Sequence, residues 1–91
     1  MKQTQINIMH DIASYTAGLG QYKMYAMYIN KNWCFYSKED SFNRKSTLVA
    51  TVTPEGKLFY SKGYNKDSFD YKAERIIEAT QGLMILFNDL N

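Results

Sequence analysis

The chain has little of what catalysis and covalent cross-linking require, because its 91 residues include one cysteine, one histidine and one proline. The single cysteine, Cys34, cannot form an internal disulfide, which favours a reducing compartment. One cysteine and one histidine also fall short of a closed zinc site, so we expect no metal and no cofactor. His10 and Cys34 form the one nucleophile–base pair available, but a free cysteine is more often a buried structural residue. We therefore expect no enzyme.

Strong charge and long apolar runs are missing too. The chain carries 11 basic and 9 acidic residues, a formal charge of +2, which is too balanced to indicate a nucleic-acid or membrane partner by itself. No segment approaches the roughly 20 apolar residues that span a bilayer. The segment Met1–His10 lacks the apolar run of a signal peptide. These features predict a cytoplasmic protein without a membrane partner.

The residues that are present are those of a folded domain. Hydrophobic residues make up 45% of the chain and aromatic residues 15%, enough for a packed core. The length fits a single domain over residues 1–91. Abundant Lys, Asn, Ile and Tyr beside scarce Arg and Pro are typical of AT-rich bacterial or phage genomes. A domain of this size has modest stability, so a homodimer is a natural supplement.

A helix is expected at each end of the chain. The first covers Gln5–Leu19, with Thr4 as its cap and glycines 18 and 20 at its end; its apolar face contains Ile8, Ile12, Tyr15 and Leu19. Asp67 or Ser68 can cap the second. Its apolar stripe contains Phe69, Ala73, Ile76, Thr80, Leu83 and Phe87, widened by Ile77 and Met84. Gly82 interrupts this stripe, either to end the helix or to let another backbone approach closely.

Strands are expected between the helices. The segments Tyr22–Ile29 and Trp33–Tyr36 are rich in aromatic and β-branched residues and are separated by turn residues, Asn30-Lys31-Asn32. A second hairpin is predicted over 47–52 and 57–64, with Pro54-Glu55-Gly56 as its turn. The polar stretch Ser37–Ser46 is predicted to be an exposed loop. The fold class is thus α+β: an N-terminal helix, an antiparallel sheet of three to four strands and a C-terminal helix, in the order α-β-β-β(-β)-α.

The first predicted strand is apolar on both of its sides. Alternate side chains of a strand point to opposite faces of the sheet. One face carries Tyr22, Met24, Ala26 and Tyr28, and the other carries Lys23, Tyr25, Met27 and Ile29. Two arrangements stay open at this point. Either both helices cover the same side and leave an aromatic face exposed, or they enclose the sheet and bury this strand.

The leading hypothesis is a small non-enzymatic interaction protein of inhibitor or adaptor type, encoded by a phage or mobile element. It would bind a protein partner through the aromatic sheet face and the 37–46 loop, with these candidate residues: Tyr25, Met27, Ile29, Trp33, Phe35 and Phe42. The alternative is a nucleic-acid-binding module that uses a basic strand and loop face: Arg44, Lys45, Lys57, Lys62 and Lys66. A homodimer would be a third use of the aromatic face.

Overall fold

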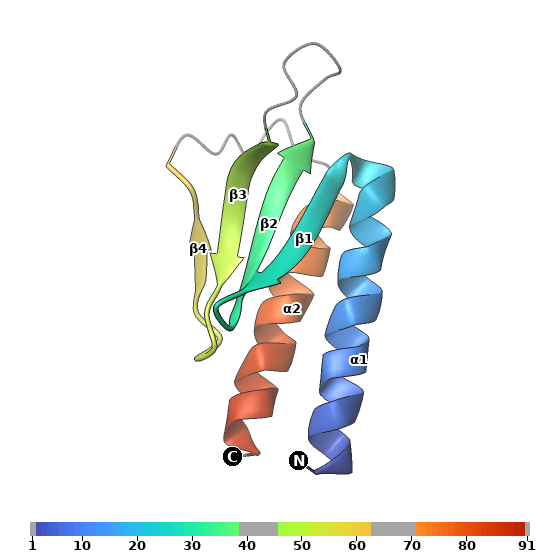
Figure 1. Ribbon diagram of the computed structural model, residues 1–91, viewed down its shortest axis with the longest axis vertical. Helices are drawn as coiled ribbons and strands as arrows, with labels where there is room; N and C mark the ends of the chain where they lie inside the picture. The colour runs from blue at the N-terminus through green and yellow to red at the C-terminus, as the bar shows by residue number, and fades with distance from the viewer. Residues whose placement is uncertain (1, 39–45, 63–70, 91) are drawn as a thin grey trace.

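A computed structural model describes residues 2–38, 46–62 and 71–90 of the chain. The predicted α+β order of helix, antiparallel strands and helix is confirmed (Figure 1). The elements are α1 (Gln3–Ala17), the 3₁₀ turn η1 (Gly18–Tyr22), β1 (Met24–Ile29), β2 (Asn32–Lys38), β3 (Ser46–Val52), β4 (Leu58–Tyr60) and α2 (Tyr71–Asp89).

The four strands form one antiparallel sheet in the order β1-β2-β3-β4. A two-residue turn joins β1 to β2, and both of its residues have positive φ, 51° at Asn30 and 67° at Lys31. Such a turn matches the right-handed twist of the flanking strands. The turn between β3 and β4 has Pro54 at its first corner, and the Gly56 amide donates to the Thr53 carbonyl at 2.9 Å. Gly56 has a φ of 82°, the positive value for which the sequence places a glycine at this turn.

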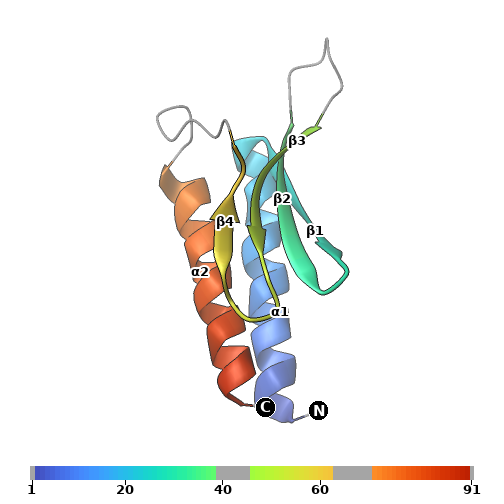
Figure 2. The ribbon, with the colours of Figure 1, turned by 90° about the vertical axis from the view of Figure 1, so that its left-hand side faces the viewer.

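Both helices lie on the same side of the sheet, which decides between the two arrangements left open by the sequence. Figure 1 shows the sheet in front with α2 behind it and α1 beside and behind β1. The quarter turn in Figure 2 separates the helix layer from the sheet. The protein therefore has two layers. The face of the sheet that points toward the helices is called the inner face below, and the opposite face is called the outer sheet face.

The core fills the space between the inner face and the helices. It contains Ile8, Ile12, Leu19, Met24, Trp33, Phe35, Val49, Ala50, Val52, Ala73, Ile77 and Met84. Thr80 is also fully buried, and its hydroxyl donates to the Ile76 carbonyl at 2.9 Å, so the polar atom is satisfied within the helix. The described part of the predicted α2 stripe is thus present, while Phe69 lies outside the described residues. The centre of the stripe is shifted toward Ile77 and Met84, because α2 contacts both the sheet and α1.

The ends of α1 differ from the prediction. The helix begins two residues earlier, at Gln3, and Thr4 is not its cap. The side chain of Gln5 accepts a hydrogen bond from the Lys2 amide at 3.2 Å and so satisfies a donor at the helix start. At the other end, α1 stops at Ala17 with Gly18 as its C-cap, so this glycine does end the helix, two residues before the predicted end at Leu19. The backbone tightens into η1 and leaves it at Lys23, which has a left-handed φ of 56°.

Neither role expected for Gly82 is present. The residue is exposed in the interior of α2, and a Cβ added there would have no neighbour within 4 Å. The close approach to α2 occurs instead at the tip of the β3–β4 hairpin. A Cβ on Gly56 would lie 2.3 Å from the Cγ1 atom of Ile85. The side chain of Asn88 also donates a hydrogen bond to the Pro54 carbonyl, so the hairpin tip is attached to α2 at two points.

The predicted strand and loop bounds also need correction. Pairing between β2 and β3 continues to Lys38 and Ser46, so the ends of the predicted 37–46 loop belong to the sheet. Its centre, residues 39–45, lies outside the described residues. The last strand, β4, is limited to three residues, and part of the predicted segment 57–64 is also outside them.

Candidate functional site

The outer sheet face is an apolar surface that neither helix covers. The strand register determines its members, because residues paired across antiparallel strands point to the same side. Among the residues whose side chains are described, they are Tyr25, Met27, Ile29, Asn32, Cys34, Tyr36, Leu48, Thr51 and Phe59. None of these nine side chains is charged. The helices cannot shield them, since both helices lie on the other side (Figures 1 and 2).

One row of this surface crosses all four strands. Met27 pairs with Cys34, Cys34 with Thr51, and Thr51 with Phe59. Its two ends are the most open positions, with 47% of Met27 and 56% of Phe59 exposed. The row is therefore a continuous, mainly apolar strip from one edge of the sheet to the other.

A second row contains two stacked tyrosines. The Tyr25 and Tyr36 rings are 5.2 Å apart between centroids, with 17° between their planes, and Leu48 continues the row on β3. Burial, the neighbouring Cys34 and Tyr25, and a hydrogen bond with Cys34 raise the pKa of the Tyr36 hydroxyl. The stack fixes two large rings in the free protein, which lowers the entropy lost when a partner covers them.

A β-bulge between the two rows sets which β3 residues reach the outer sheet face. The register shifts from the Phe35–Ala50 pair to the Tyr36–Leu48 pair, so Val49 is an extra residue on β3. Val49 and Ala50 are both buried, whereas Leu48 is 38% exposed. Without the bulge, strict alternation along β3 would place Leu48 in the core.

Trp33 and Phe35 do not belong to this surface, which corrects the prediction that grouped them with Tyr25. Trp33 pairs with Tyr28 and Phe35 with Ala26, so both point to the inner face. Phe35 is fully buried and Trp33 is 8% exposed, with its ring 5.0 Å from the Tyr28 ring. The two aromatic side chains hold the layers together and are not accessible to a partner.

The other three predicted residues of β1, Tyr25, Met27 and Ile29, do lie on the outer sheet face. Phe42 lies outside the described residues. The sequence prediction missed the six remaining members: Asn32, Cys34, Tyr36, Leu48, Thr51 and Phe59. A turn of two residues, 30 and 31, would have assigned Cys34 and Tyr36 to the same face as Met27 and Tyr25. The prediction assumed a three-residue turn, Asn30-Lys31-Asn32, and such a turn does not determine which β2 residues share a face with Met27 and Tyr25.

The basic residues of the alternative hypothesis are only partly described. Lys57 and Lys62 are exposed and flank β4 at its two ends. Arg44, Lys45 and Lys66 lie outside the described residues. Two exposed lysines therefore flank, along the chain, the edge strand that carries Phe59.

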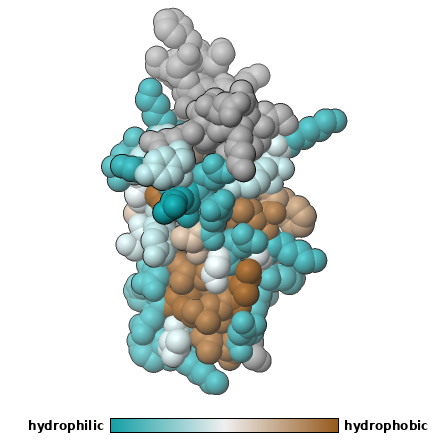
Figure 3. Space-filling view, turned by 180° about the vertical axis from the view of Figure 1, so that it is seen from behind, coloured by the Kyte–Doolittle hydropathy of each residue, from teal (hydrophilic) through white to brown (hydrophobic). Residues whose placement is uncertain are grey.

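The helix layer has a second exposed apolar area. Figure 3, which views the molecule from behind, shows an apolar region in the lower half, where the C-terminal part of α2 lies. Ile85 is 44% exposed and Leu86 is 48% exposed. This area is formed by fewer open side chains than the outer sheet face.

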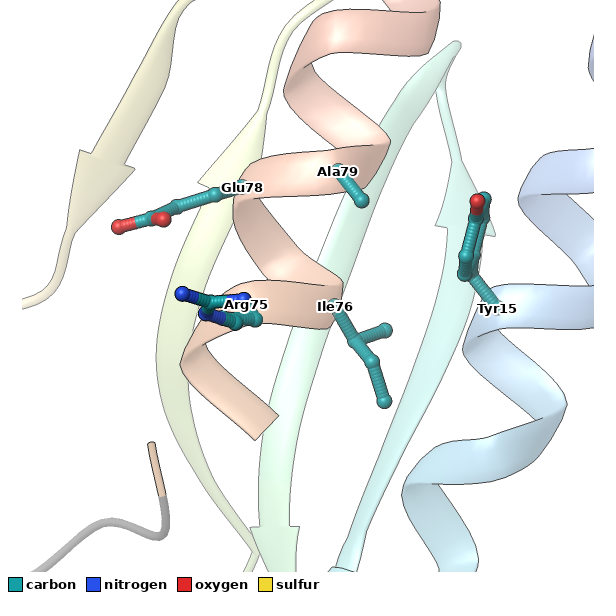
Figure 4. A pocket seen from close by; sticks show the side chains of 5 residues that line it. All are labelled: Tyr15, Arg75, Ile76, Glu78 and Ala79. Atoms are coloured by element: carbon teal, nitrogen blue, oxygen red, sulfur yellow. The ribbon is translucent and has the colours of Figure 1, made fainter. Parts of the chain in front are cut away.

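A hollow of about 550 Å³ lies between the helices. It is lined by Tyr15 of α1 and by Arg75, Ile76, Glu78 and Ala79 of α2. Figure 4 shows Ile76 and Ala79 directed toward Tyr15, whereas Arg75 and Glu78 extend from another side of α2. Ligand pockets usually combine an apolar wall with polar groups that converge on the ligand. Here the two charged side chains point away from Tyr15 and do not converge on the hollow, so the hollow does not have the character of a binding pocket.

Cys34 and His10, the one candidate pair of nucleophile and base, lie in different layers of the protein. Cys34 is on the outer sheet face, while His10 is exposed on α1 in the other layer. Residues 2–38, 46–62 and 71–90 contain no group of three or more His, Cys, Asp or Glu side chains placed to hold a metal ion. Within the same residues, neither helix has the length and apolar character to cross a bilayer.

Comparison with known proteins gave no relatives: no protein-family model, curated protein sequence or solved structure matches the chain.

Proposed function

We propose that the protein is a non-enzymatic interaction protein, of inhibitor or adaptor type, whose outer sheet face binds a protein partner. The observation that carries this proposal is the one-sided cover of the sheet. Both helices lie against the inner face, and the nine described side chains of the opposite face carry no charge. Exposed apolar patches of more than a few hundred Å² commonly mark interaction sites.

The residue types support a protein partner. Tyr, Phe and Met are enriched at the centres of protein interfaces, where charged residues are depleted. The most open members, Met27 and Phe59, are large side chains that can enter pockets on a partner. The stacked pair of Tyr25 and Tyr36 provides a flat, ordered area between them. The partner would therefore present an apolar surface of its own, and binding would depend little on salt.

The test is capture of partners from the native host with variants that place a charge on one surface at a time. Phe59→Glu and Leu48→Glu each put a carboxylate on the outer sheet face. Leu86→Glu is the matched control, because Leu86 is 48% exposed but belongs to the helix layer. We expect both outer-face variants to lose the captured protein and the control to retain it. Retention by Phe59→Glu and Leu48→Glu, with loss by Leu86→Glu, would move the interaction to the helix layer and reject the proposal.

The second candidate, a nucleic-acid-binding module, is supported by the position of Phe59 between the exposed Lys57 and Lys62. An aromatic ring flanked by cations can stack on a base while the lysines contact phosphates. This function predicts binding to single-stranded DNA or RNA that weakens steeply as salt increases. Fluorescence anisotropy with labelled oligonucleotides, comparing the wild type with a Lys57→Glu/Lys62→Glu variant, tests it. No binding at low salt would exclude this candidate.

A further inference from the structure

The β1 edge of the sheet carries backbone groups that a further strand can pair with. Among the described strands, β1 has β2 as its single neighbour. The two-residue turn after β1 is closed by Ile29 and Asn32, a pair that exchanges both backbone hydrogen bonds. Hydrogen-bonded pairs alternate along the ladder, so every second residue, counted back from Ile29, bonds to β2. Ala26 and Tyr28 therefore direct their N–H and C=O groups to the outer edge.

The helix layer continues past this edge. In Figure 1, α1 lies on the opposite side of β1 from β2, and Figure 2 shows that α1 belongs to the layer behind the sheet. A strand added to β1 would therefore lie in front of α1, which would cover the inner face of the added strand. The edge is thus a place where a fifth strand would find both backbone partners and a surface to rest on.

The side of α1 next to the β1 edge carries no charge. Tyr15 lines the hollow between the helices, so it marks the side of α1 that faces α2. At about 100° per residue, three side chains lie on the other side of the buried Ile12, toward the β1 edge. They are Met9, Ala13 and Thr16, of which Ala13 is exposed and the other two are half-buried. An added strand would rest on them with apolar or small side chains.

A lysine stands at each end of β1. Lys23 precedes the strand and Lys31 follows it in the turn, and both side chains are exposed. Both residues also have a left-handed backbone, with φ of 56° at Lys23 and 67° at Lys31. Glycine is the residue that a helix end or such a hairpin turn favours at these positions. Local backbone geometry therefore does not explain why lysine occupies both of them.

These lysines determine which strands the edge accepts. A two-fold axis at Met27 would set Lys23 of one copy of the chain opposite Lys31 of a second copy, and like charges placed opposite each other destabilise a strand pair. Lysines on sheet edges commonly prevent self-pairing in this way. A strand with a negative charge at each end meets the opposite condition, because the six residues between the lysines are uncharged. The edge thus discriminates between strands by the charge at their ends.

We propose that the β1 edge binds an extended segment of another protein, which adds a fifth strand to the sheet and has an acidic residue at each end of an apolar or β-branched stretch. Pairing with the backbone of Ala26 and Tyr28 supplies affinity, and alternate side chains select the sequence. Lys23 and Lys31 are separated by eight positions. Carboxylates about seven or eight residues apart in the segment would reach them, at about 3.3 Å per residue of strand.

The inference goes beyond the proposed function, because it uses the edge of the sheet and not its outer face. The variants Phe59→Glu and Leu48→Glu, which test the outer sheet face, should leave binding at the β1 edge unchanged.

The first experiment titrates the protein into a fluorescently labelled synthetic peptide, Glu-Thr-Val-Thr-Val-Thr-Val-Glu, with blocked ends, and measures anisotropy. The wild type should bind this peptide. A control peptide with Lys in place of both Glu residues should bind about tenfold more weakly, because two attractive contacts with exposed lysines become repulsive.

The second experiment exchanges the charges on the protein. Lys23→Glu/Lys31→Glu should invert the preference and bind the Lys-ended peptide more tightly than the Glu-ended one. Lys57→Glu/Lys62→Glu is the matched control, since it makes the same change of charge beside β4 and should keep the wild-type preference. Circular dichroism verifies that each variant is folded.

The third experiment tests the strand pairing itself. Two versions of the Glu-ended peptide are methylated on one or the other set of alternate backbone nitrogens. One set faces β1 in a strand pair and the other faces solvent, so one version should lose binding and the other should retain it. Hydrogen exchange gives the position, because the amides of Ala26 and Tyr28 should exchange more slowly when the unmodified peptide is bound.

The proposal requires that the preference for Glu-ended peptide follow Lys23 and Lys31. A wild type that does not bind the Glu-ended peptide overturns it, and so does a preference that Lys57→Glu/Lys62→Glu inverts and Lys23→Glu/Lys31→Glu does not. Binding that survives both sets of methylation, or that leaves the exchange of the Ala26 and Tyr28 amides unchanged, overturns the pairing with β1.

Discussion

Gly56 lies against Ile85, so close that a Cβ on the glycine would be 2.3 Å from the Ile85 Cγ1 atom and 3.0 Å from the Ile85 amide nitrogen. The two residues join the tip of the β3–β4 hairpin to the C-terminal half of α2. The contact needs a residue without a side chain, and the φ of 82° at this position also favours glycine.

Gly56→Ala should destabilise the protein by about 2–4 kcal/mol, the combined cost of a left-handed backbone with a Cβ and of overpacking against α2. This is a large part of the stability of a small domain, roughly 5–15 kcal/mol. Urea unfolding measures it. Adding Ile85→Ala should recover only part of the loss, because the Ile85 backbone and the positive φ are unchanged. Full recovery would mean that the side-chain clash is the whole effect.

Gly82→Ala should stabilise the protein, the opposite effect to that of Gly56→Ala. The residue is exposed within α2 with nothing in reach of a Cβ, so alanine gains helix propensity at no steric cost. The expected gain is about 0.5–1 kcal/mol in the free energy of unfolding. Thermal unfolding monitored by circular dichroism is sufficient to detect it. A loss of stability would contradict the uninterrupted course of α2 through residue 82.

Phe35 and Phe59 provide a test of the two faces of the sheet. Phe35→Ala removes a fully buried ring and should cost about 3–5 kcal/mol. Phe59→Ala removes a ring that is 56% exposed and should change stability by no more than about 0.5 kcal/mol. Equilibrium unfolding in denaturant compares them. Similar losses for the two variants would show that the outer sheet face is covered.

Tyr36 should make stability sensitive to alkaline pH. Burial, with Cys34 and Tyr25 nearby, raises the pKa of its hydroxyl above the ordinary value of 10.0. The folded protein then holds this proton more tightly than the unfolded chain does. The resulting stabilisation is complete below pH 10 and is lost as the pH rises through the folded-state pKa of Tyr36.

The corresponding measurement is denaturant unfolding across a series of alkaline pH values. Stability of Tyr36→Phe should decline less steeply above pH 10 than that of the wild type. Tyr71→Phe, which removes an exposed phenol from the helix layer, should follow the wild type. If Tyr36→Phe and the wild type decline in parallel, Tyr36 does not contribute to the alkaline transition.

Much of the fold could be predicted from local signals. The spacing of apolar residues predicts both helices, and the Pro54-Glu55-Gly56 turn predicts the second hairpin, because these signals act over a few residues. Helix ends were less predictable, since Gly18 and Gly82 tolerate either continuation or termination. The contact of Gly56 with Ile85 joins residues far apart in the chain and leaves no local signal.

The candidate site shows the same division. The sequence by itself determined that Tyr25, Met27 and Ile29 share one face of β1, because a strand has a side-chain period of two. Only the tertiary structure decided that this face is the open one. The alternation within a strand is symmetric, and the packing of both helices onto the inner face breaks that symmetry. The same packing buries Trp33 and Phe35. Their residue types alone do not distinguish them from aromatic residues on the surface.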